Sequence, residues 1–309
     1  MAGVRTAALA ACTVALSGLL GCSQPQQLAQ PSATPSPTPV HTTTAPPPAQ
    51  NAGALPRDEA GKPTIQRRHI KAAGLDRTYI ISIPPHYDAL RALPLILVFH
   101  GYGESAEKIR NYSNLEKSTA IVVFMDGMDS AWAPAPYATT TGDQDLAFVD
   151  AVRRQVEGEF RINKARVFAA GLSNGGGFAT YVGCQRPQTL TAIATVSAAF
   201  YAEVSESCST IPLKHVNFHG TNDPVMEYGG GQRHKASYES IATVLNESAR
   251  RNHCLLDPIA RDFASGVAQF TWLHCDASLI HYQIHGGRHV WPSFATEVLL
   301  DFFGVDYDP

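Results

Sequence analysis

The chain has 309 residues, of which 44% are hydrophobic and 17% charged, with a formal net charge of −3. This length and apolar content are enough for one large domain or two small ones with a sizeable core. A balance so near neutral argues against a general nucleic-acid binder, which would carry a basic excess. We therefore expect no nucleic-acid partner.

The N-terminal segment differs in composition from the rest, because no Lys, Arg, Asp or Glu occurs between Thr6 and Pro56. An apolar run over 6–20 follows Arg5 and is too short to span a bilayer stably, but it suits a secretory signal. The run ends in Leu19-Leu20-Gly21-Cys22, which resembles the end of a bacterial lipoprotein signal. We predict a signal peptide over 1–21 and a lipid on Cys22; the alternative is an ordinary signal peptide with an incidental cysteine.

Residues 22–56 are predicted to form a tether. The segment contains Pro31–Pro39, with proline at alternate positions toward its end, and the run Pro46-Pro47-Pro48. It has too few large apolar side chains to offset the entropy of ordering, and its prolines hold the chain extended. We expect a disordered spacer between a membrane lipid and a catalytic domain over 57–309, which places the protein outside the cytoplasm. A leader without function is the alternative.

From Arg57 onward, short apolar runs alternate with amphipathic segments. The predicted strands are 77–83, 94–99, 120–125, 165–170, 191–196, 215–218 and 279–284, and the predicted helices are 145–160, 238–250 and 292–303. Continuous apolar runs of this length indicate parallel strands buried on both faces. The alternation predicts a single α/β domain with a doubly wound, mostly parallel sheet and helices on both of its faces.

Once Cys12 has left with the signal and Cys22 has received its lipid, four of the six cysteines remain: Cys184, Cys208, Cys254 and Cys275. An exported chain with an even number of thiols is expected to oxidise them. Three pairings are possible, and we favour the nearest neighbours, 184 with 208 and 254 with 275. Each bridge would stabilise the fold by about 3 kcal/mol on the chain-entropy model. Zinc is the alternative, but no Cys-x-x-Cys spacing occurs.

The run Gly171-Leu172-Ser173-Asn174-Gly175 matches G-x-S-x-G directly after a predicted strand. Glycines flank the serine in this motif because a sharp strand-to-helix turn leaves no room for side chains there, and the turn lifts the hydroxyl out of the sheet. The glycines that follow are expected to open a helix packed closely on the sheet. We predict Ser173 as a nucleophile; a glycine-rich turn with a solvated serine is the alternative.

A serine hydroxyl needs a base that is oriented by a carboxylate, and in this arrangement the chain order is serine, acid, histidine. Asp223 lies just past the predicted strand 215–218 and is the predicted acid. Glu227 and Asp257 are rivals, but neither follows a strand end so directly. The structural alternative for Asp223 is an Asx turn before Pro224.

Three histidines compete for the role of base. His281 and His285 share one face of the predicted strand 279–284, whereas His289 lies in a glycine-rich loop before the last helix, and we predict His289. Their four-residue spacing would align metal ligands on a helix, but Gly286-Gly287 argues against a helix there. No H-E-x-x-H motif occurs. We expect neither a metal nor another cofactor.

Acyl transfer forms an oxyanion that needs main-chain donors held in place. The N–H of Asn174, the residue after the nucleophile, is one predicted donor. The other is expected from the turn His100-Gly101-Tyr102-Gly103, where we favour the N–H of Tyr102 and Gly103 is the alternative.

Together these motifs resemble the α/β-hydrolase superfamily, and more narrowly the secreted polyhydroxybutyrate-depolymerase-like and feruloyl-esterase-like esterases. The resemblance runs from about Leu75 to the C-terminus. It is carried by His100-Gly101-Tyr102-Gly103, Asp126-Gly127 with Trp132 following, Asp145-Leu146-Ala147-Phe148, Gly171-Leu172-Ser173-Asn174-Gly175, His219-Gly220-Thr221-Asn222-Asp223 and Gly287-Arg288-His289-Val290-Trp291-Pro292. It implies Ser173, Asp223 and His289 as a catalytic triad and the same two disulfides.

Two positions depart from the pattern of this group: Arg288 stands where relatives often have glycine, and Tyr102 where many have cysteine. Both are expected to border the pocket, so the substrate preference of relatives does not transfer. The chain ends soon after its last predicted helix, so we expect no polymer-binding module and no degradation of solid polyester.

The substrate pocket is expected to draw on aromatic side chains, with core or rim positions as the alternative for each: Tyr102, Trp132, Tyr137, Tyr228 and Trp291. Arg288 would steer an anionic substrate or else be a solvated side chain.

The predicted function is an extracytoplasmic serine esterase that acts on short-chain, hydroxyacyl or phenolic acid esters through an acyl-enzyme. Acyl transfer to a cell-envelope sugar or lipid would use the same triad. A catalytically silent binding lipoprotein is the third reading.

Overall fold

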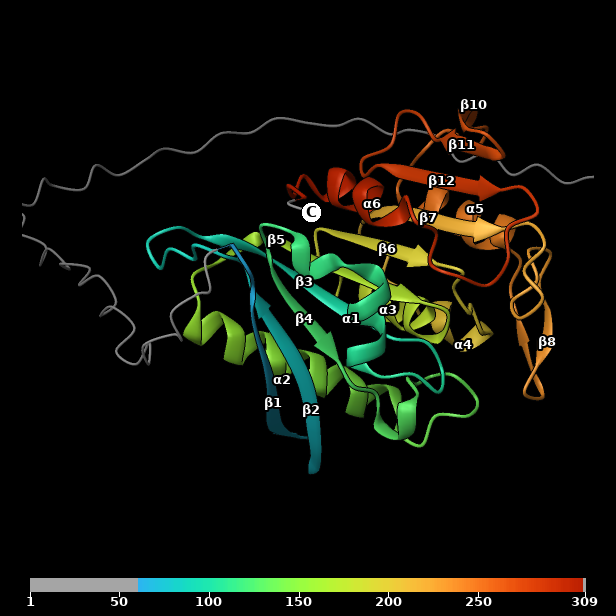
Figure 1. The fold of residues 1–309 in the computed structure, drawn as a ribbon. Helices are drawn as coiled ribbons and strands as arrows, with labels where there is room; N and C mark the ends of the chain where they lie inside the picture. The colour runs from blue at the N-terminus through green and yellow to red at the C-terminus, as the bar shows by residue number, and fades with distance from the viewer. Residues whose placement is uncertain (1–60, 308–309) are drawn as a thin grey trace, which may run out of the picture. The chain divides into compact units, whose positions relative to one another are not determined.

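The structure is a computed structural model that describes residues 61–307. The predicted signal peptide, the lipidated Cys22 and the tether lie outside the described residues. The described part is built on one large sheet (Figure 1). In spatial order its strands are β1 (Thr64–Ala72), β2 (Leu75–Ile83), β4 (Ile121–Met125), β3 (Leu93–Phe99), β5 (Ile162–Leu172), β6 (Ala192–Val196), β7 (Lys214–Gly220), β12 (Leu279–Ile284), β11 (Val267–Thr271) and β10 (Ile259–Ala264).

The centre of this sheet is parallel and its flanks are antiparallel. Neighbouring strands from β4 across to β12 all pair in parallel. The pairs β1–β2, β2–β4, β11–β12 and β10–β11 are antiparallel. Every residue of β3 and β4 is buried, as the continuous apolar runs predicted. The predicted mostly parallel sheet is confirmed.

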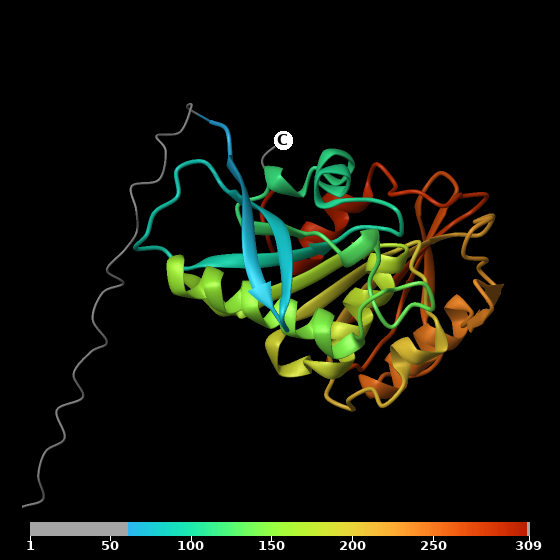
Figure 2. The same cartoon turned by 90° about the horizontal axis from the view of Figure 1, so that it is seen from below.

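Helices cover both faces of the sheet, as Figures 1 and 2 show. On one face, α1 (Ala106–Ser113) and α6 (Ala295–Phe303) pack on the strands through one apolar cluster. On the other face lie α2 (Gly142–Glu159), α3 (Asn174–Gln185) and α5 (Ile241–Arg251), which contribute to two further clusters. The predicted doubly wound α/β fold is therefore confirmed.

Short elements fill the connections. They are α4 (Ala202–Ser205), the 3₁₀ turns Leu115–Lys117, Met128–Ser130 and Pro187–Thr189, and a separate hairpin of β8 (Gly231–Arg233) and β9 (Ala236–Tyr238). The predicted helix 238–250 begins later than expected, at Ile241, because the side chain of Ser240 accepts the N–H of Thr243 and caps it there. The predicted helix 292–303 likewise begins at Ala295.

An ion pair buried between β2 and α2 fixes the long loop that follows β4. Arg77 Nη1 donates to Asp145 Oδ1 at 2.8 Å, and both side chains are almost fully buried. Asp145 Oδ2 also accepts the main-chain N–H of Ala133 and the hydroxyl of Thr140. The guanidinium lies 4.1 Å from the ring centroid of Phe148. A charge pair satisfied in this way holds the loop rigidly against the sheet.

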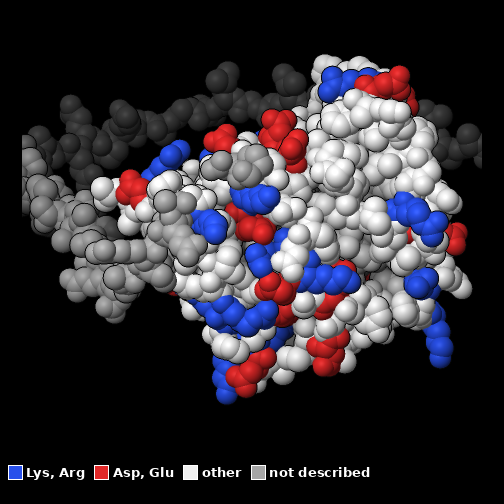
Figure 3. Space-filling model, in the orientation of Figure 1, with Lys and Arg blue, Asp and Glu red and all other residues white. Residues whose placement is uncertain are grey.

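Two disulfides, Cys184–Cys208 and Cys254–Cys275, are formed, which confirms the predicted pairing. No helix within residues 61–307 combines the length and the apolar character that crossing a membrane requires. Basic and acidic side chains are interspersed over the face shown in Figure 3.

Candidate active site

Three predicted site residues lie at one edge of the sheet. Ser173 directly follows β5, Asp223 follows β7, and His289 lies in the loop after β12. These strands are parallel and lie close together in the order β5-β6-β7-β12. Because the carboxyl ends of parallel strands meet at the same edge, residues far apart in sequence converge there.

Ser173 occupies a strained turn between β5 and α3. Its backbone has φ 53° and ψ −120°, a conformation that residues other than glycine rarely adopt. The turn is possible because its glycines pack against main chain. A Cβ on Gly171 would lie 2.2 Å from the carbonyl oxygen of Gly175, and one on Gly175 would lie 2.1 Å from that of Phe99. The strand-to-helix turn therefore requires glycine at both positions.

Asp223 and the partly buried His289 form a hydrogen-bonded pair. Nδ1 of His289 lies 2.8 Å from Oδ2 of Asp223, whose side chain is fully buried. Oδ1 of the same carboxylate accepts the N–H groups of Val225 and Met226. Burial by itself would raise the pKa of Asp223, but the hydrogen bonds from His289 and Met226 outweigh it and lower that pKa. The ionised carboxylate assigns a proton to Nδ1 of His289 and leaves Nε2 as an acceptor.

The rival candidates lie apart from this pair. Glu227, Asp257 and His285 are exposed. His281 is buried in β12, where its Nε2 is 2.8 Å from the hydroxyl of Tyr228. Burial lowers the pKa of His281 to about 3, so this imidazole is neutral. The structure thus brings Asp223, rather than either rival acid, to His289.

The turn after β3 leaves one N–H free to act as an oxyanion donor. The N–H of Gly101 donates to the Glu104 carboxylate at 3.1 Å, and that of Gly103 donates to the carbonyl oxygen of Ser130 at 2.9 Å. The N–H of Glu104 donates back to Gly101. Among residues 61–307 the N–H of Tyr102 has no acceptor. These contacts favour Tyr102 over Gly103.

The second predicted donor stands at the start of α3. Asn174 is its first residue, and the first intrahelical bond at this end runs from Gly177 to the carbonyl of Ser173. The N–H groups in the first turn of a helix have no intrahelical partner and carry partial positive charge. The N–H of Asn174 is therefore available to an anion beside Ser173.

Trp132 does not line a substrate pocket, which corrects the expectation from the sequence. Its side chain is fully buried and stacks on Phe178 with ring centroids 4.8 Å apart. Its indole N–H donates to the carbonyl of His100 at 3.1 Å. Nε2 of His100 in turn accepts the N–H of Gly127. Through its hydrogen bond to His100, Trp132 supports the main chain of the turn that carries Tyr102.

Tyr102 and Tyr137 form an aromatic cluster at the protein surface together with His234, a residue that sequence reasoning missed. The tyrosine ring centroids are 4.1 Å apart, and that of His234 lies 4.7 Å from Tyr137 and 5.8 Å from Tyr102. Tyr102 is 52% exposed. His234 belongs to the β8–β9 hairpin, and no local motif links that hairpin to the turn after β3.

Two other predicted pocket residues direct their polar atoms into the protein. The Tyr228 hydroxyl is hydrogen-bonded to His281, and the indole N–H of Trp291 donates to Thr296 Oγ1 at 3.0 Å. Both rings are partly buried against the core. Their polar atoms therefore make contacts inside the protein, and a place for their rings in a substrate pocket stays a prediction. Arg288 is exposed and forms no ion pair with any residue in 61–307.

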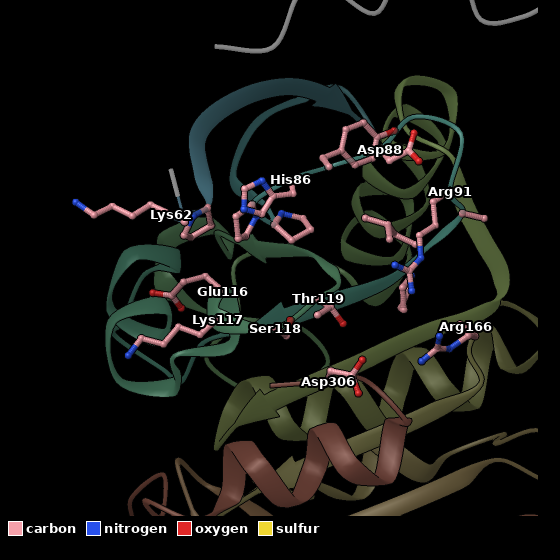
Figure 4. A pocket seen from close by; sticks show the side chains of 18 of the residues that line it. Lys62, His86, Asp88, Arg91, Glu116, Lys117, Ser118, Thr119, Arg166 and Asp306 are labelled. Atoms are coloured by element: carbon pink, nitrogen blue, oxygen red, sulfur yellow. The ribbon is translucent and has the colours of Figure 1, made fainter. Parts of the chain in front are cut away.

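Two large hollows lie away from the sheet edge that carries Ser173, Asp223 and His289. One of about 540 Å³ opens near the amino ends of β3 and β4, and Figure 4 shows Arg91, Lys117 and Arg166 among the side chains around it. Another of about 520 Å³ lies beside the Cys184–Cys208 bridge. Neither is lined by the serine, acid or histidine described above. Residues 61–307 contain no group of three or more His, Cys, Asp or Glu side chains placed to hold a metal.

Comparison with known proteins shows likeness to esterases, although no family model matches the chain. The chain is 24% identical to the putative esterase NocK of Nocardia uniformis subsp. tsuyamanensis, over 84% of this chain and 83% of that protein. It is 28% identical to feruloyl esterase C of Emericella nidulans, over 74% of this chain and 83% of the relative. Three probable feruloyl esterases C from Aspergillus species match over only 58–63% of their own length.

Among solved structures, the acetyl xylan esterase from Aspergillus awamori is similar with a TM-score of 0.60 and 12% identity, covering 77% of this chain and 99% of that chain. At this identity the likeness concerns the fold alone. The protein has the α/β-hydrolase fold.

Proposed function

We propose that this protein, a carboxylic ester hydrolase with the α/β-hydrolase fold, cleaves its substrates through an acyl-enzyme formed on Ser173. The observation that carries the proposal is the hydrogen-bonded pair of Asp223 and His289, which lies at the same sheet edge as the strained turn of Ser173. A carboxylate, an oriented imidazole and a serine on such a turn form the catalytic arrangement of serine esterases.

In the proposed first half-reaction, Nε2 of His289 takes the hydroxyl proton of Ser173 while Oγ bonds to the ester carbonyl carbon. The negative charge that develops on the carbonyl oxygen is stabilised by the main-chain N–H groups of Tyr102 and Asn174. His289 then gives its proton to the alcohol oxygen as the carbon–oxygen bond breaks. Asp223 remains ionised throughout and keeps the imidazole in the tautomer with the proton on Nδ1.

In the second half-reaction, water attacks the acyl carbon and passes its proton to Nε2 of His289. The carbon–Oγ bond breaks, the proton returns to Ser173, and the free acid leaves. The His289 imidazole accepts and returns each proton that moves, so the side chains and main-chain groups named above suffice for both half-reactions with water as the second reactant.

For substrates we propose short-chain, hydroxyacyl or phenolic acid esters. The names of the relatives support esters of this kind, since they include feruloyl esterases. Tyr102, whose main-chain N–H is the proposed oxyanion donor, has an exposed ring that contacts the ring of Tyr137. The two rings offer aromatic surface to an acyl or alcohol group.

We also propose that the protein is exported, with residues 57–309 as its catalytic domain. The two disulfides support export, because thiols oxidise outside the cytosol. Lipid attachment at Cys22 and the tether are predictions about residues outside 61–307. Mass spectrometry of the membrane-bound protein and of a Cys22→Ser variant tests them: a diacylglyceryl N-terminus lost in the variant is expected, and an unmodified Cys22 contradicts the anchor.

The experiment that tests the proposed reaction compares the wild type with Ser173→Ala. We expect a fluorophosphonate probe to label the wild type alone, and hydrolysis of a p-nitrophenyl ester to be lost in the variant. Ser197, a buried serine after β6, gives a matched control, and Ser197→Ala should still be labelled. Equal labelling of wild type and Ser173→Ala would overturn the assignment of the nucleophile.

A further inference from the structure

A second imidazole, His219, lies against the proposed catalytic acid, and the reaction described above does not use it. Its Nε2 is 3.4 Å from Oδ2 of Asp223 and 2.8 Å from the carbonyl oxygen of Met226. The side chain is 1% exposed, on β7 four residues before Asp223. A histidine buried in contact with a carboxylate of this kind requires a physical account.

The contacts determine which ring nitrogen carries the proton. A carbonyl oxygen can only accept a hydrogen bond, so Nε2 of His219 must be the protonated nitrogen, and it donates to Met226. Oδ2 of Asp223 lies 3.4 Å from the same nitrogen, as a second and longer polar contact. Nδ1 is buried and has no partner among residues 61–307. Burial lowers the pKa of His219, an effect that outweighs the opposing influence of Asp223. His219 is therefore a neutral donor.

Three N–H groups thus donate hydrogen bonds to the Asp223 carboxylate, and the N–H of His219 lies near it as a longer contact. Oδ1 accepts from Val225 and Met226 at 2.8 and 2.9 Å. Oδ2 accepts from His289 at 2.8 Å, and His219 approaches the same oxygen at 3.4 Å. With donors on both oxygens, the carboxylate has one orientation that satisfies every contact.

The other polar groups around His219 are neutral. The ring of Tyr228 lies 5.9 Å from that of His219 in an edge arrangement, and its hydroxyl is bonded to His281. Burial keeps His281 uncharged as well. Asp223 and His289 are thus the groups whose charge His219 faces at close range.

We propose that His219 is a positioning residue for the pair of Asp223 and His289. The positive end of its Nε2–H dipole lies 3.4 Å from Oδ2 of Asp223; this contact holds that oxygen toward Nδ1 of His289 and offsets part of the carboxylate charge that acts on that imidazole. The inference rests on the proposed function, because it concerns the same acid and base.

Removing this donor has two consequences. The carboxylate is held less firmly, so the base is oriented less often for proton transfer and kcat falls. The carboxylate charge is also shared with one donor fewer, so it favours protonated His289 more strongly, and the acid limb of the pH–rate profile moves to higher pH. Substrate binding does not involve this residue, so KM should stay nearly constant.

The experiment uses His219→Leu, which lacks the donor, and His219→Gln, whose amide keeps an N–H at similar reach. His215→Leu is the matched control. His215 lies on the same strand and is equally buried, but it contacts Thr195 at 2.8 Å and Ser248 at 3.2 Å instead of the catalytic acid. Rates are expressed per active site titrated with a fluorophosphonate, so that loss of folded protein does not count as loss of activity.

We expect His219→Leu to lower kcat about tenfold, because the polar contact with the carboxylate is lost. Its KM should change less than about twofold, and its acid limb should move up by about half a pH unit. His219→Gln should restore most of kcat and the wild-type limb. His215→Leu should lower the melting temperature but leave kcat and the limb unchanged.

Wild-type kcat and acid limb in His219→Leu would overturn the inference. A His219→Gln variant as impaired as His219→Leu would do the same, because it would show that packing rather than donation matters. If His219→Leu fails to fold, the Gln variant decides alone, since it must keep the wild-type limb. If Ser173→Ala retains ester hydrolysis, the proposed function fails first; if only His219→Leu behaves as wild type, only this inference fails.

Discussion

Trp132 and Asn174 are joined by two hydrogen bonds. The main-chain N–H of Trp132 donates to Asn174 Oδ1 at 2.8 Å, and Asn174 Nδ2 donates to the main-chain carbonyl of Trp132 at 3.0 Å. The residue that follows Ser173 thus fixes the loop after β4 with its side chain and offers its own N–H to the proposed oxyanion site. Asn174 thus contributes to the position of the site through its side chain and to the proposed chemistry through its main-chain N–H.

Asn174→Ala should therefore impair both stability and catalysis. It leaves two buried main-chain groups of Trp132 without partners, at a cost of about 1–3 kcal/mol each. It also loosens the loop behind the turn of Tyr102, so kcat should fall. Asn252 is a matched control, because it makes the same reciprocal pair of bonds with Leu213. Asn252→Ala should lose stability yet keep kcat per titrated site; equal kcat in both variants would contradict the role of Asn174.

Gly175→Ala should abolish activity, because the added Cβ would lie 2.1 Å from the carbonyl oxygen of Phe99 and 2.5 Å from that of His100. The turn of Ser173 cannot form without displacing β3. Gly158→Ala serves as the control on an exposed turn of α2, where the new Cβ meets nothing within 4 Å. It should stabilise the protein by up to about 1 kcal/mol. Circular dichroism melts and ester hydrolysis measure both effects, and an active Gly175→Ala enzyme would refute the steric argument.

Breaking the ion pair of Arg77 and Asp145 should be strongly destabilising. Both side chains are almost fully buried, and Arg77→Met leaves the Asp145 carboxylate without its counter-charge, at a cost of about 3–5 kcal/mol. Lys71 and Asp76 form an exposed pair at 3.9 Å, so Lys71→Met should change stability by no more than about 1 kcal/mol. Urea unfolding compares the two variants, and similar losses in both would contradict the importance of burial.

Stability should fall steeply in mild acid. Burial lowers the pKa of both His215 and His281 to about 3, whereas an unfolded histidine titrates near 6.5. Between these values the unfolded chain binds protons that the folded chain does not. The stabilisation is complete above about pH 6.5 and declines by up to about 1.4 kcal/mol per pH unit and per histidine as the pH falls toward 3.

Urea unfolding at a series of pH values measures this slope. His215→Leu removes one of the titrating groups, so the slope of unfolding free energy against pH should fall by the amount that corresponds to about one bound proton. A variant slope as steep as that of the wild type would show that His215 is protonated in the folded state.

The central strands could be predicted because each is buried on both faces and has a continuous apolar run, as in β3 and β4. The outermost strands β1, β10 and β11 have no such run. In β1 partly buried and exposed positions alternate, with charged residues such as Arg67 and Lys71 exposed, and β10 is exposed along its length. A search for apolar runs cannot find these strands, because strands at the edge of the sheet are buried on one face at most and need no continuous apolar run.

The sequence by itself determined which residues reach the edge of the sheet where the active site is proposed. Ser173, Asp223 and His289 each follow a strand of the parallel sheet, and parallel strands place their carboxyl ends together whatever the length of the connections. Tertiary structure alone decided what these residues contact. It placed Trp132 behind the site, left the N–H of Tyr102 free and brought His219 against Asp223. Such contacts depend on the direction of each side chain and on partners distant in sequence, which motif and spacing do not encode.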